Sequence, residues 1–170
     1  MIKDNYDLER IRIILRTSLT KLVVWDLDLI ERKVHEKAIN HRLAIYLEDV
    51  LRIYGWPYHV DIEYNKNGDN PKGYTRGDGT PANAIPDIIV HRRQHNDENL
   101  LFFEIKKLES KPLDIEKTTA FLAQNYDYKF ACLINYWPDE DHIDIQLKQF
   151  NQADKKYQFN KANFELTEIL

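Results

Sequence analysis

The spacing of apolar residues changes from helical to alternating near Pro57, and this change constrains the fold more than any other feature. Before Pro57, apolar residues recur at steps of three and four. That spacing predicts two amphipathic helices, from Asp7 to about Leu22 and from about Ile30 to Tyr54. After Pro57, apolar and polar residues alternate, which indicates strands. The chain is therefore expected to fold as an α/β domain with a mixed central sheet flanked by helices.

Four strands and one more helix are expected after this change of spacing. The strands are Tyr58 to Tyr64, Ile85 to His91, Leu100 to Leu108 and Lys129 to Tyr136, and the helix is Leu113 to Asn125. A polar connection from Asn65 to Asn83 separates the first two strands and contains most of the glycines. Loops of this length in compact domains are either functional or mobile.

Two segments are harder to assign. Leu22 to Leu29 fits either a helix or a strand. After Pro138, the spacing of Ile143, Leu147 and Phe150 suggests a short helix, and Phe159 to Leu166 suggests an edge strand. We expect one domain over 1–170, with an N-terminal helical extension at 1–30, a core at 33–136 and a C-terminal tail at 137–170.

Composition restricts the class of protein. The single cysteine, Cys132, excludes an internal disulfide and a multi-cysteine zinc site. No apolar stretch is long enough to span a membrane, and the first residues lack the apolar region of a signal peptide, so the cytoplasm is the expected location. With 24 Lys+Arg against 28 Asp+Glu, the net charge is −4, which leans against tight, indiscriminate binding of nucleic acid.

Charged residues on otherwise apolar strands are the best candidates for chemistry. Asp87 is expected on the same strand face as Ile89, and Glu104 and Lys106 on the same face as Phe102. Burying an isolated charge is costly, so these charges require partners. Two carboxylates on adjacent strands could bind a hard divalent cation such as Mg²⁺. The alternative is a salt-bridge ladder between Glu104 and Lys106 on an exposed face.

A third carboxylate comes from the second helix. Glu36 precedes Leu43 by seven residues and Leu47 by eleven, and it therefore continues the apolar stripe of that helix. A carboxylate on this stripe would point towards the sheet. The alternative is that Glu36 is an ordinary charge on the helix surface.

The segments Ile85-Pro86-Asp87 and Glu104-Ile105-Lys106 resemble the two-part signature of the PD-(D/E)XK nuclease superfamily. The expected order of elements, over about Lys33 to Tyr136, is similar to the αβββαβ core of that restriction-endonuclease-like fold. An acidic residue on the preceding helix, here Glu36, is another frequent feature of the family.

The resemblance implies metal-dependent hydrolysis of phosphodiester bonds. Asp87 and Glu104 would ligate Mg²⁺, or Mn²⁺ as a substitute, together with the backbone carbonyl of Ile105. Lys106 would orient and help to deprotonate the attacking water, or would stabilise the charge that develops on the phosphorane. Glu36 could help to hold a second metal or its water ligands. The implied enzyme is a Mg²⁺-dependent deoxyribonuclease, an endonuclease rather than an exonuclease.

Two alternatives remain open. One is a nucleic-acid-binding or assembly module on the same fold whose cleavage is absent or depends on a partner. The other is an unrelated α/β domain in which Asp87, Glu104 and Lys106 lie far apart.

Substrate contacts are expected from two groups of basic and aromatic residues. Lys72, Tyr74 and Arg76 lie on the long loop between glycines, and Arg92, Arg93 and Lys107 flank the motif residues. The alternative for the first group is an ordinary polar hairpin loop. The expected partners are nucleic acid, a second copy of the chain, since cutting a duplex commonly uses two sites, and a protein that confers targeting.

Overall fold

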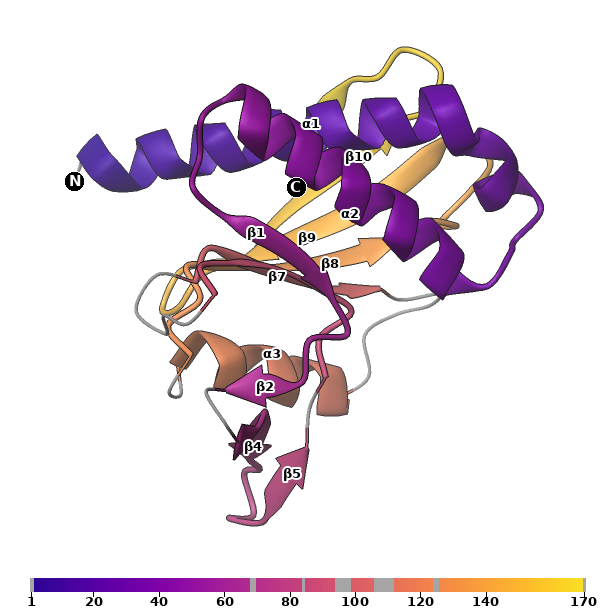
Figure 1. Ribbon diagram of the computed structural model, residues 1–170. Coiled ribbons are helices and arrows are strands. Elements are labelled where there is room, and N and C mark those ends of the chain that lie inside the picture. The colour runs from indigo at the N-terminus through magenta and orange to yellow at the C-terminus, as the bar shows by residue number, and fades with distance from the viewer. Residues whose placement is uncertain are drawn as a thin grey trace.

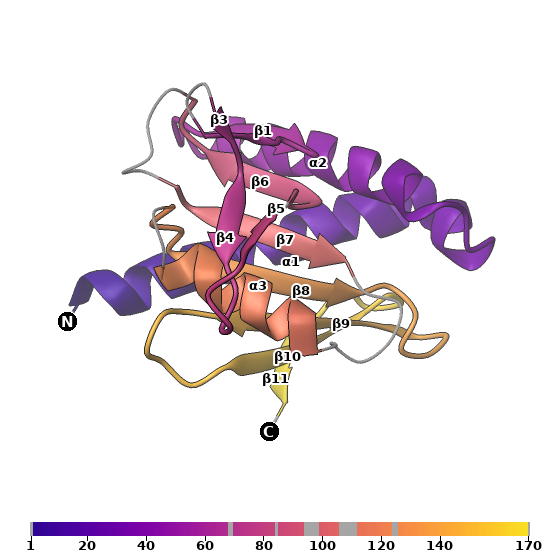
Figure 2. The same cartoon turned by 90° about the horizontal axis from the view of Figure 1, so that it is seen from below.

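A computed structural model of the chain has three layers, with a sheet between two helices on one side and one helix on the other (Figure 1). It describes residues 2–67, 70–83, 85–93, 99–105, 112–123 and 126–169. Seen from below, α3 lies in front of the sheet, and α1 and α2 lie behind it (Figure 2). The chain is thus a mixed α/β protein.

The first helix, α1 (Ile2–Glu31), is longer than the sequence predicts. It includes the ambiguous segment from Leu22 to Leu29, where the helix is kinked at Asp26 (φ −138°, ψ 26°). At the kink, the Asp26 carboxylate accepts hydrogen bonds from Arg42 and Tyr46 of the second helix, which ties the two helices together. Within the described residues, no helix combines the length and the apolar character needed to cross a membrane.

The second helix, α2 (Glu36–Ile53), is separated from α1 by a short turn, so the prediction of one helix from Ile30 is wrong in its first residues. His35 caps the new start, since its Nδ1 accepts a hydrogen bond from the Lys37 N–H at 3.3 Å. Gly55, at a φ of 68°, follows the end of the helix, in a conformation that glycine adopts without strain.

Seven strands form the central sheet, in the order β1-β6-β7-β8-β9-β10-β11. Their bounds are β1 (His59–Ile62), β6 (Ile88–His91), β7 (Leu101–Ile105), β8 (Phe130–Asn135), β9 (His142–Lys148), β10 (Lys155–Asn160) and β11 (Leu166–Ile169). Among the described strands of this sheet, only the β7–β8 pair is parallel, and α3 (Pro112–Ala123) lies in the crossover between these two strands. The expected mixed sheet is confirmed, although it is mostly antiparallel.

The two faces of the sheet carry separate clusters of buried residues. Leu101, Phe103 and Ile105 face the α1–α2 layer, whereas Ile89 and Phe102 face α3. The predicted alternation of these strands is therefore confirmed. Every residue of β7 is buried, so the alternative in which Glu104 lies on an exposed face is wrong.

The alternation predicted for Tyr58 to Tyr64 fails at its end. Glu63 has a φ of 47°, which turns the chain after β1. Tyr64 consequently packs in the cluster on the α3 side, while Val60 packs on the opposite side of the sheet.

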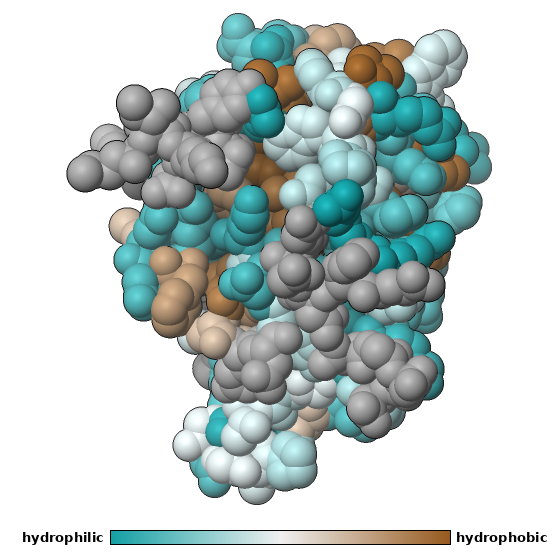
Figure 3. Space-filling model, turned by 60° about the vertical axis from the view of Figure 1, so that its left-hand side comes forward, coloured by the Kyte–Doolittle hydropathy of each residue, from teal (hydrophilic) through white to brown (hydrophobic). Residues whose placement is uncertain are grey.

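The long polar connection forms two small hairpins below the sheet. They are β2 (Lys66–Asn67) with β3 (Asn70–Pro71), and β4 (Gly73–Thr75) with β5 (Pro81–Asn83). We call residues 73–83, which contain the second hairpin, the arm. The arm projects beyond α3 in Figure 1 and is the lower lobe in Figure 3, where its residues are mostly pale to hydrophilic.

The C-terminal part of the chain is not a separate tail, because it supplies β9, β10 and β11 to the same sheet. The helix expected around Ile143 is wrong, since β9 alternates buried and half-buried residues along its whole length. The expected edge strand from Phe159 to Leu166 instead spans the turn between β10 and β11.

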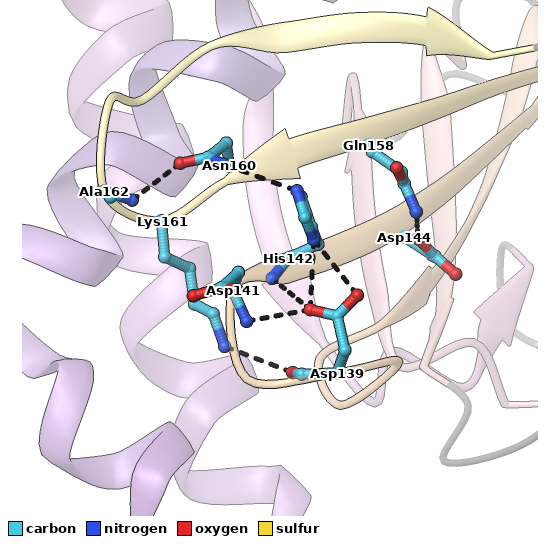
Figure 4. Close-up of polar contacts among 8 residues, drawn as sticks. All are labelled: Asp139, Asp141, His142, Asp144, Gln158, Asn160, Lys161 and Ala162. Atoms are coloured by element: carbon cyan, nitrogen blue, oxygen red, sulfur yellow. Dashed lines mark hydrogen bonds and ion pairs between the residues drawn. The ribbon is translucent and has the colours of Figure 1, made fainter.

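Polar contacts hold the turns of these last strands (Figure 4). The Asp139 carboxylate accepts hydrogen bonds from the backbone N–H groups of Asp141 and His142, at 2.8 and 2.7 Å. The His142 ring also contacts this carboxylate, and its Nε2 lies 3.3 Å from Nδ2 of Asn160 in the neighbouring turn. The two turns are thereby joined.

We predict that α1 contributes to the stability of the whole domain. Ile11 is fully buried, whereas Ile13 on the same helix is 44% exposed. Ile11→Ala should lower the free energy of unfolding by about 2–5 kcal/mol, and the matched control Ile13→Ala by about 1 kcal/mol or less. Urea unfolding followed by circular dichroism measures both. Equal losses would contradict the placement of α1 on the core.

Candidate functional site

Asp87 and the end of β7 meet at one end of the sheet. Asp87 immediately precedes β6, and its Oδ2 accepts a hydrogen bond of 2.7 Å from the backbone N–H of Ile105. The backbone N–H of Asp87 donates in turn to the carbonyl of Phe103 at 3.2 Å. The two halves of the predicted motif are therefore in direct contact, and Asp87 is held beside Glu104.

Glu104 is the buried carboxylate of this site, with 4% of its surface exposed. It lies on the α3 face of β7, as Phe102 does. Lys117 of α3 forms an ion pair with its Oε1 and also donates a hydrogen bond of 3.0 Å to the carbonyl of Ile85. A carboxylate buried to this extent is costly unless it is paired, and Lys117 supplies the opposite charge.

Glu36 is the first residue of α2, at the same end of the sheet. One turn later, the buried Asn40 accepts a hydrogen bond of 3.3 Å from the hydroxyl of Tyr136, which follows β8. Burial raises the pKa of Tyr136 well above its ordinary value, and the charges of Asp87 and Glu36 raise it further. The charges of both carboxylates therefore affect the same buried hydroxyl. The contacts of Lys37, the next residue of α2, connect the start of this helix to the segment of Asp87.

An exposed ion pair forms the rim of this site. Lys37 Nζ lies 2.7 Å from Oε1 of Glu63, and the Glu63 N–H donates to the carbonyl of Asp87. The hydrogen bond with Glu63 raises the pKa of Lys37, and the charges of Glu63 and Asp87 contribute in the same direction. This pair was not predicted from the sequence, because the turn at Glu63 has no clear local signature.

The motif lysine, Lys106, and its neighbour Lys107 were also expected at this site. Lys106 and Lys107 lie outside the described residues, and their roles stay predictions.

The donors that could hold a divalent cation are the carboxylates of Asp87 and Glu104 and the carbonyl of Ile105. Within the described ranges, no group of three or more His, Cys, Asp or Glu side chains is arranged to hold a metal ion. A cation bound by Glu104 would have to compete with the Lys117 ammonium group. Carboxylate and carbonyl oxygens are nevertheless the ligands that Mg²⁺ prefers.

The structure corrects the expectation for Lys72. Only 4% of its surface is exposed, and its ammonium group donates a hydrogen bond of 3.0 Å to the hydroxyl of Tyr128. An ammonium group enclosed in this way is not presented to a phosphate. Tyr74 is half-buried against the α3-side cluster, whereas Arg76 is exposed on the arm.

The two arginines after β6 differ in their surroundings. Arg92 is half-buried and Arg93 is exposed. Arg93 forms two hydrogen bonds with the Asp61 carboxylate of β1, at 2.9 and 2.5 Å, and His91 Nε2 lies 2.7 Å from the same carboxylate. Burial alone would raise the pKa of Asp61, but the hydrogen bonds from His91 and Arg93 and the Arg93 charge hold it well below its ordinary value.

Lys117 is a further residue of this site that was not predicted from the sequence. It precedes the buried Phe121 by four residues, so both lie on the face of α3 that packs on the sheet. The sequence did contain a signal for this ion pair. Lys117 lies on the apolar stripe of its helix, and the neighbouring strand carries a glutamate among apolar residues.

No family model matches this chain, and neither a curated protein nor a solved structure is significantly similar to it. The function of the site is therefore inferred from the residues and the geometry described above.

We predict that the ion pair between Lys117 and Glu104 is needed for stability. Lys117→Met leaves a buried carboxylate without its ammonium partner, so the free energy of unfolding should fall by about 3 kcal/mol. Adding Glu104→Gln should recover part of this loss, because the uncompensated charge is removed. Urea unfolding of the single and double variants provides the measurement. The control Lys37→Met disrupts an exposed pair and should have a much smaller effect.

We also predict an acid-dependent contribution from Asp61. Its pKa in the folded state is lower than the ordinary value of 3.8, so the ionised carboxylate stabilises the fold above that value. The contribution is lost as the pH falls from 3.8 towards the lower folded-state pKa. The difference in free energy of unfolding between the wild type and Asp61→Asn should shrink over this range, and urea titrations from pH 7 to pH 3 measure it. A constant difference would contradict the assignment.

Proposed function

We propose that this chain is a metal-dependent nuclease of the PD-(D/E)XK type that hydrolyses phosphodiester bonds in DNA. The observation that carries the proposal is the hydrogen bond from the Ile105 N–H to the Asp87 carboxylate. It joins the two halves of a motif that are separated in sequence, at the end of two adjacent strands.

The order of elements supports the same proposal. From α2, the chain continues through β1, β6, β7, α3 and β8. With the two small hairpins treated as an insertion after β1, this is an αβββαβ order, as expected of a restriction-endonuclease-like core. The helix residue Glu36 lies at the sheet end that also holds Asp87 and Glu104.

The chemistry follows from the donors at this end of the sheet. Mg²⁺, or Mn²⁺ in its place, would polarise a phosphate oxygen and acidify a water molecule. Asp87, Glu104 and the Ile105 carbonyl would hold it, and Glu36 would orient its water ligands or a second ion. Lys106 would hold the attacking water and accept its proton, while Lys117 orients the Glu104 carboxylate.

Basic and aromatic residues would contact the substrate. We assign the exposed Arg76 on the arm, with Tyr74 at its base, to this role. Arg92 and Arg93 follow β6, whereas Asp87 precedes it, so these two arginines lie at the opposite end of that strand and would contact a more distant part of the substrate. Lys107, which follows the motif in the sequence, is proposed as a further contact. Because Arg93 is paired with Asp61, its attraction for phosphate is reduced, and binding should be modest and sensitive to salt. Endonuclease cleavage by a homodimer, with targeting by a protein partner, is compatible with this weak binding.

One observation favours a second candidate function. The Glu104 carboxylate is already paired with Lys117, which is the state expected of a binding or assembly module that no longer holds a metal. In that case the chain would bind nucleic acid without cleaving it, or would cleave only when a partner displaces Lys117.

We predict metal-dependent cleavage that requires the motif. Purified protein should cut at least one member of a panel of linear, nicked, branched and single-stranded DNA with Mg²⁺ or Mn²⁺. Lys106→Ala should lower the rate by about 10²-fold or more, and Asp87→Asn and Glu104→Gln should abolish cleavage. Gel analysis of the products gives the rates.

Asp154→Asn, immediately before β10, and Lys156→Ala, on β10, are the matched controls and should retain full activity. An RNA panel tests the choice of DNA. The proposal is overturned if no nucleic acid is cut and calorimetry detects no metal binding that Asp87→Asn removes. DNA binding without cleavage, unaffected by Lys106→Ala, would favour the second candidate.

A further inference from the structure

Lys72 is a buried lysine that the proposed chemistry does not use. Its Nζ lies 5.3, 5.5 and 5.4 Å from the ring centroids of Tyr64, Tyr126 and Tyr128, respectively. It also donates a hydrogen bond to the Tyr128 hydroxyl at 3.0 Å. Fully buried lysines are rare unless they are paired, and here three aromatic rings surround the ammonium group.

We call Lys72 and the three surrounding rings, those of Tyr64, Tyr126 and Tyr128, the Lys72 cage. This cage joins parts of the chain that are distant in sequence. Lys72 lies between the two hairpins, Tyr64 follows β1, and Tyr126 and Tyr128 precede β8. One side chain therefore connects the base of the arm to the central sheet and to the segment that follows α3.

Hydrogen bonds of the backbone beside Lys72 also connect the base of the arm to neighbouring segments. The Lys72 N–H donates to the carbonyl of Asn65 at 2.7 Å. The Tyr126 hydroxyl accepts from the Gly73 N–H at 2.8 Å and donates to the Gly73 carbonyl at 2.6 Å. A Cβ atom at Gly73 would lie 2.9 Å from the carbonyl oxygen of Ala82, so glycine permits the close pairing of β4 with β5.

The turn of the arm is also attached to α3. The Gly77 N–H donates a hydrogen bond to the Glu116 carboxylate. Glu116 is the neighbour of Lys117, which holds Glu104. The arm is thus fixed at its base by the Lys72 cage and near its turn by the helix that supports the candidate site.

We infer that Lys72 is a positioning residue, an internal anchor that fixes the arm beside the candidate site without contacting the substrate. The part of this inference that concerns substrate rests on the proposed function. The part that concerns the arm depends only on the contacts of Lys72.

Because Lys72 is charged, it is expected to fix the position of the arm without adding to the stability of the whole domain. Burial lowers the pKa of Lys72 to about 8, and the Asp61 carboxylate opposes this shift. The other groups facing the ammonium are Tyr64, Tyr126 and Tyr128, and Asp61 itself is paired with His91 and Arg93. Because the folded-state pKa lies below 10.5, the buried charge destabilises the fold at neutral pH. Replacing it by an apolar side chain should release the arm without unfolding the domain.

Hydrogen exchange of the full chain at pH 7 tests the anchor directly. In Lys72→Met, the amides of residues 73–83 should exchange faster, on the order of tenfold, while the midpoint of global unfolding stays unchanged or rises. Tyr128→Phe keeps the ring, removes the hydrogen-bond acceptor and should accelerate the same amides less. Lys66→Met, the same substitution at an exposed site in the first hairpin, is the matched control and should leave them unchanged. Unchanged exchange of the arm in both cage variants overturns the inference.

A double-mutant cycle tests the link to substrate. DNA affinity is measured with Ca²⁺ in place of Mg²⁺, for Arg76→Ala in the wild-type and Lys72→Met backgrounds. If Lys72 acts by positioning the arm, the effect of Arg76→Ala should disappear in the Lys72→Met background. Additive losses would instead assign Lys72 to direct contact and overturn the inference. If the wild type binds no DNA, the proposed function fails, while hydrogen exchange still decides whether Lys72 is an anchor.

Discussion

The packing of α3 on the sheet is linked to one buried carboxylate, that of Glu104 near the end of β7. Glu104 is surrounded by apolar residues on a strand that is buried along its whole length, so its charge has to be compensated within the fold. Lys117 provides the compensation, which requires α3 to pack on this face of the sheet. The parallel pairing of β7 with β8 follows, because α3 is the crossover between the two strands.

The same end of the sheet gathers several other charged groups. Asp87 is held by the backbone of Ile105, and Glu36 and Asp87 both act on the buried hydroxyl of Tyr136. Such a concentration of carboxylates has little structural benefit by itself, because like charges disfavour one another. Under the proposed function, a divalent cation would offset these charges. Lys117 supplies one positive charge within the fold, which is why a nuclease and a binding module are both compatible with this site.

Much of the fold could be predicted because its strands and helices have one buried face. The alternation around Phe102 placed Glu104 on the correct side of β7, and the stripe of α2 correctly predicted that Leu43 and Leu47 are buried. β9 was missed although its sequence alternates, because Ile143 and Leu147 are also spaced as on one face of a helix. The face of Tyr64 was predicted wrongly for a different reason. Glu63 has a positive φ, so the side chain of Tyr64 lies on the opposite side of the sheet from that expected.

The sequence by itself determined the order of the main elements, the faces of the central strands and the two parts of the motif, because each depends on residues close together in the chain. Only the tertiary structure decided the partners of the charges. Lys72 and Tyr128, or Lys117 and Glu104, meet through packing of distant segments, and no local pattern encodes which ammonium group reaches which cage or carboxylate. A basic residue on a polar loop thus became a buried anchor, because the chain after α3 folds back over it with three tyrosine rings around its charge.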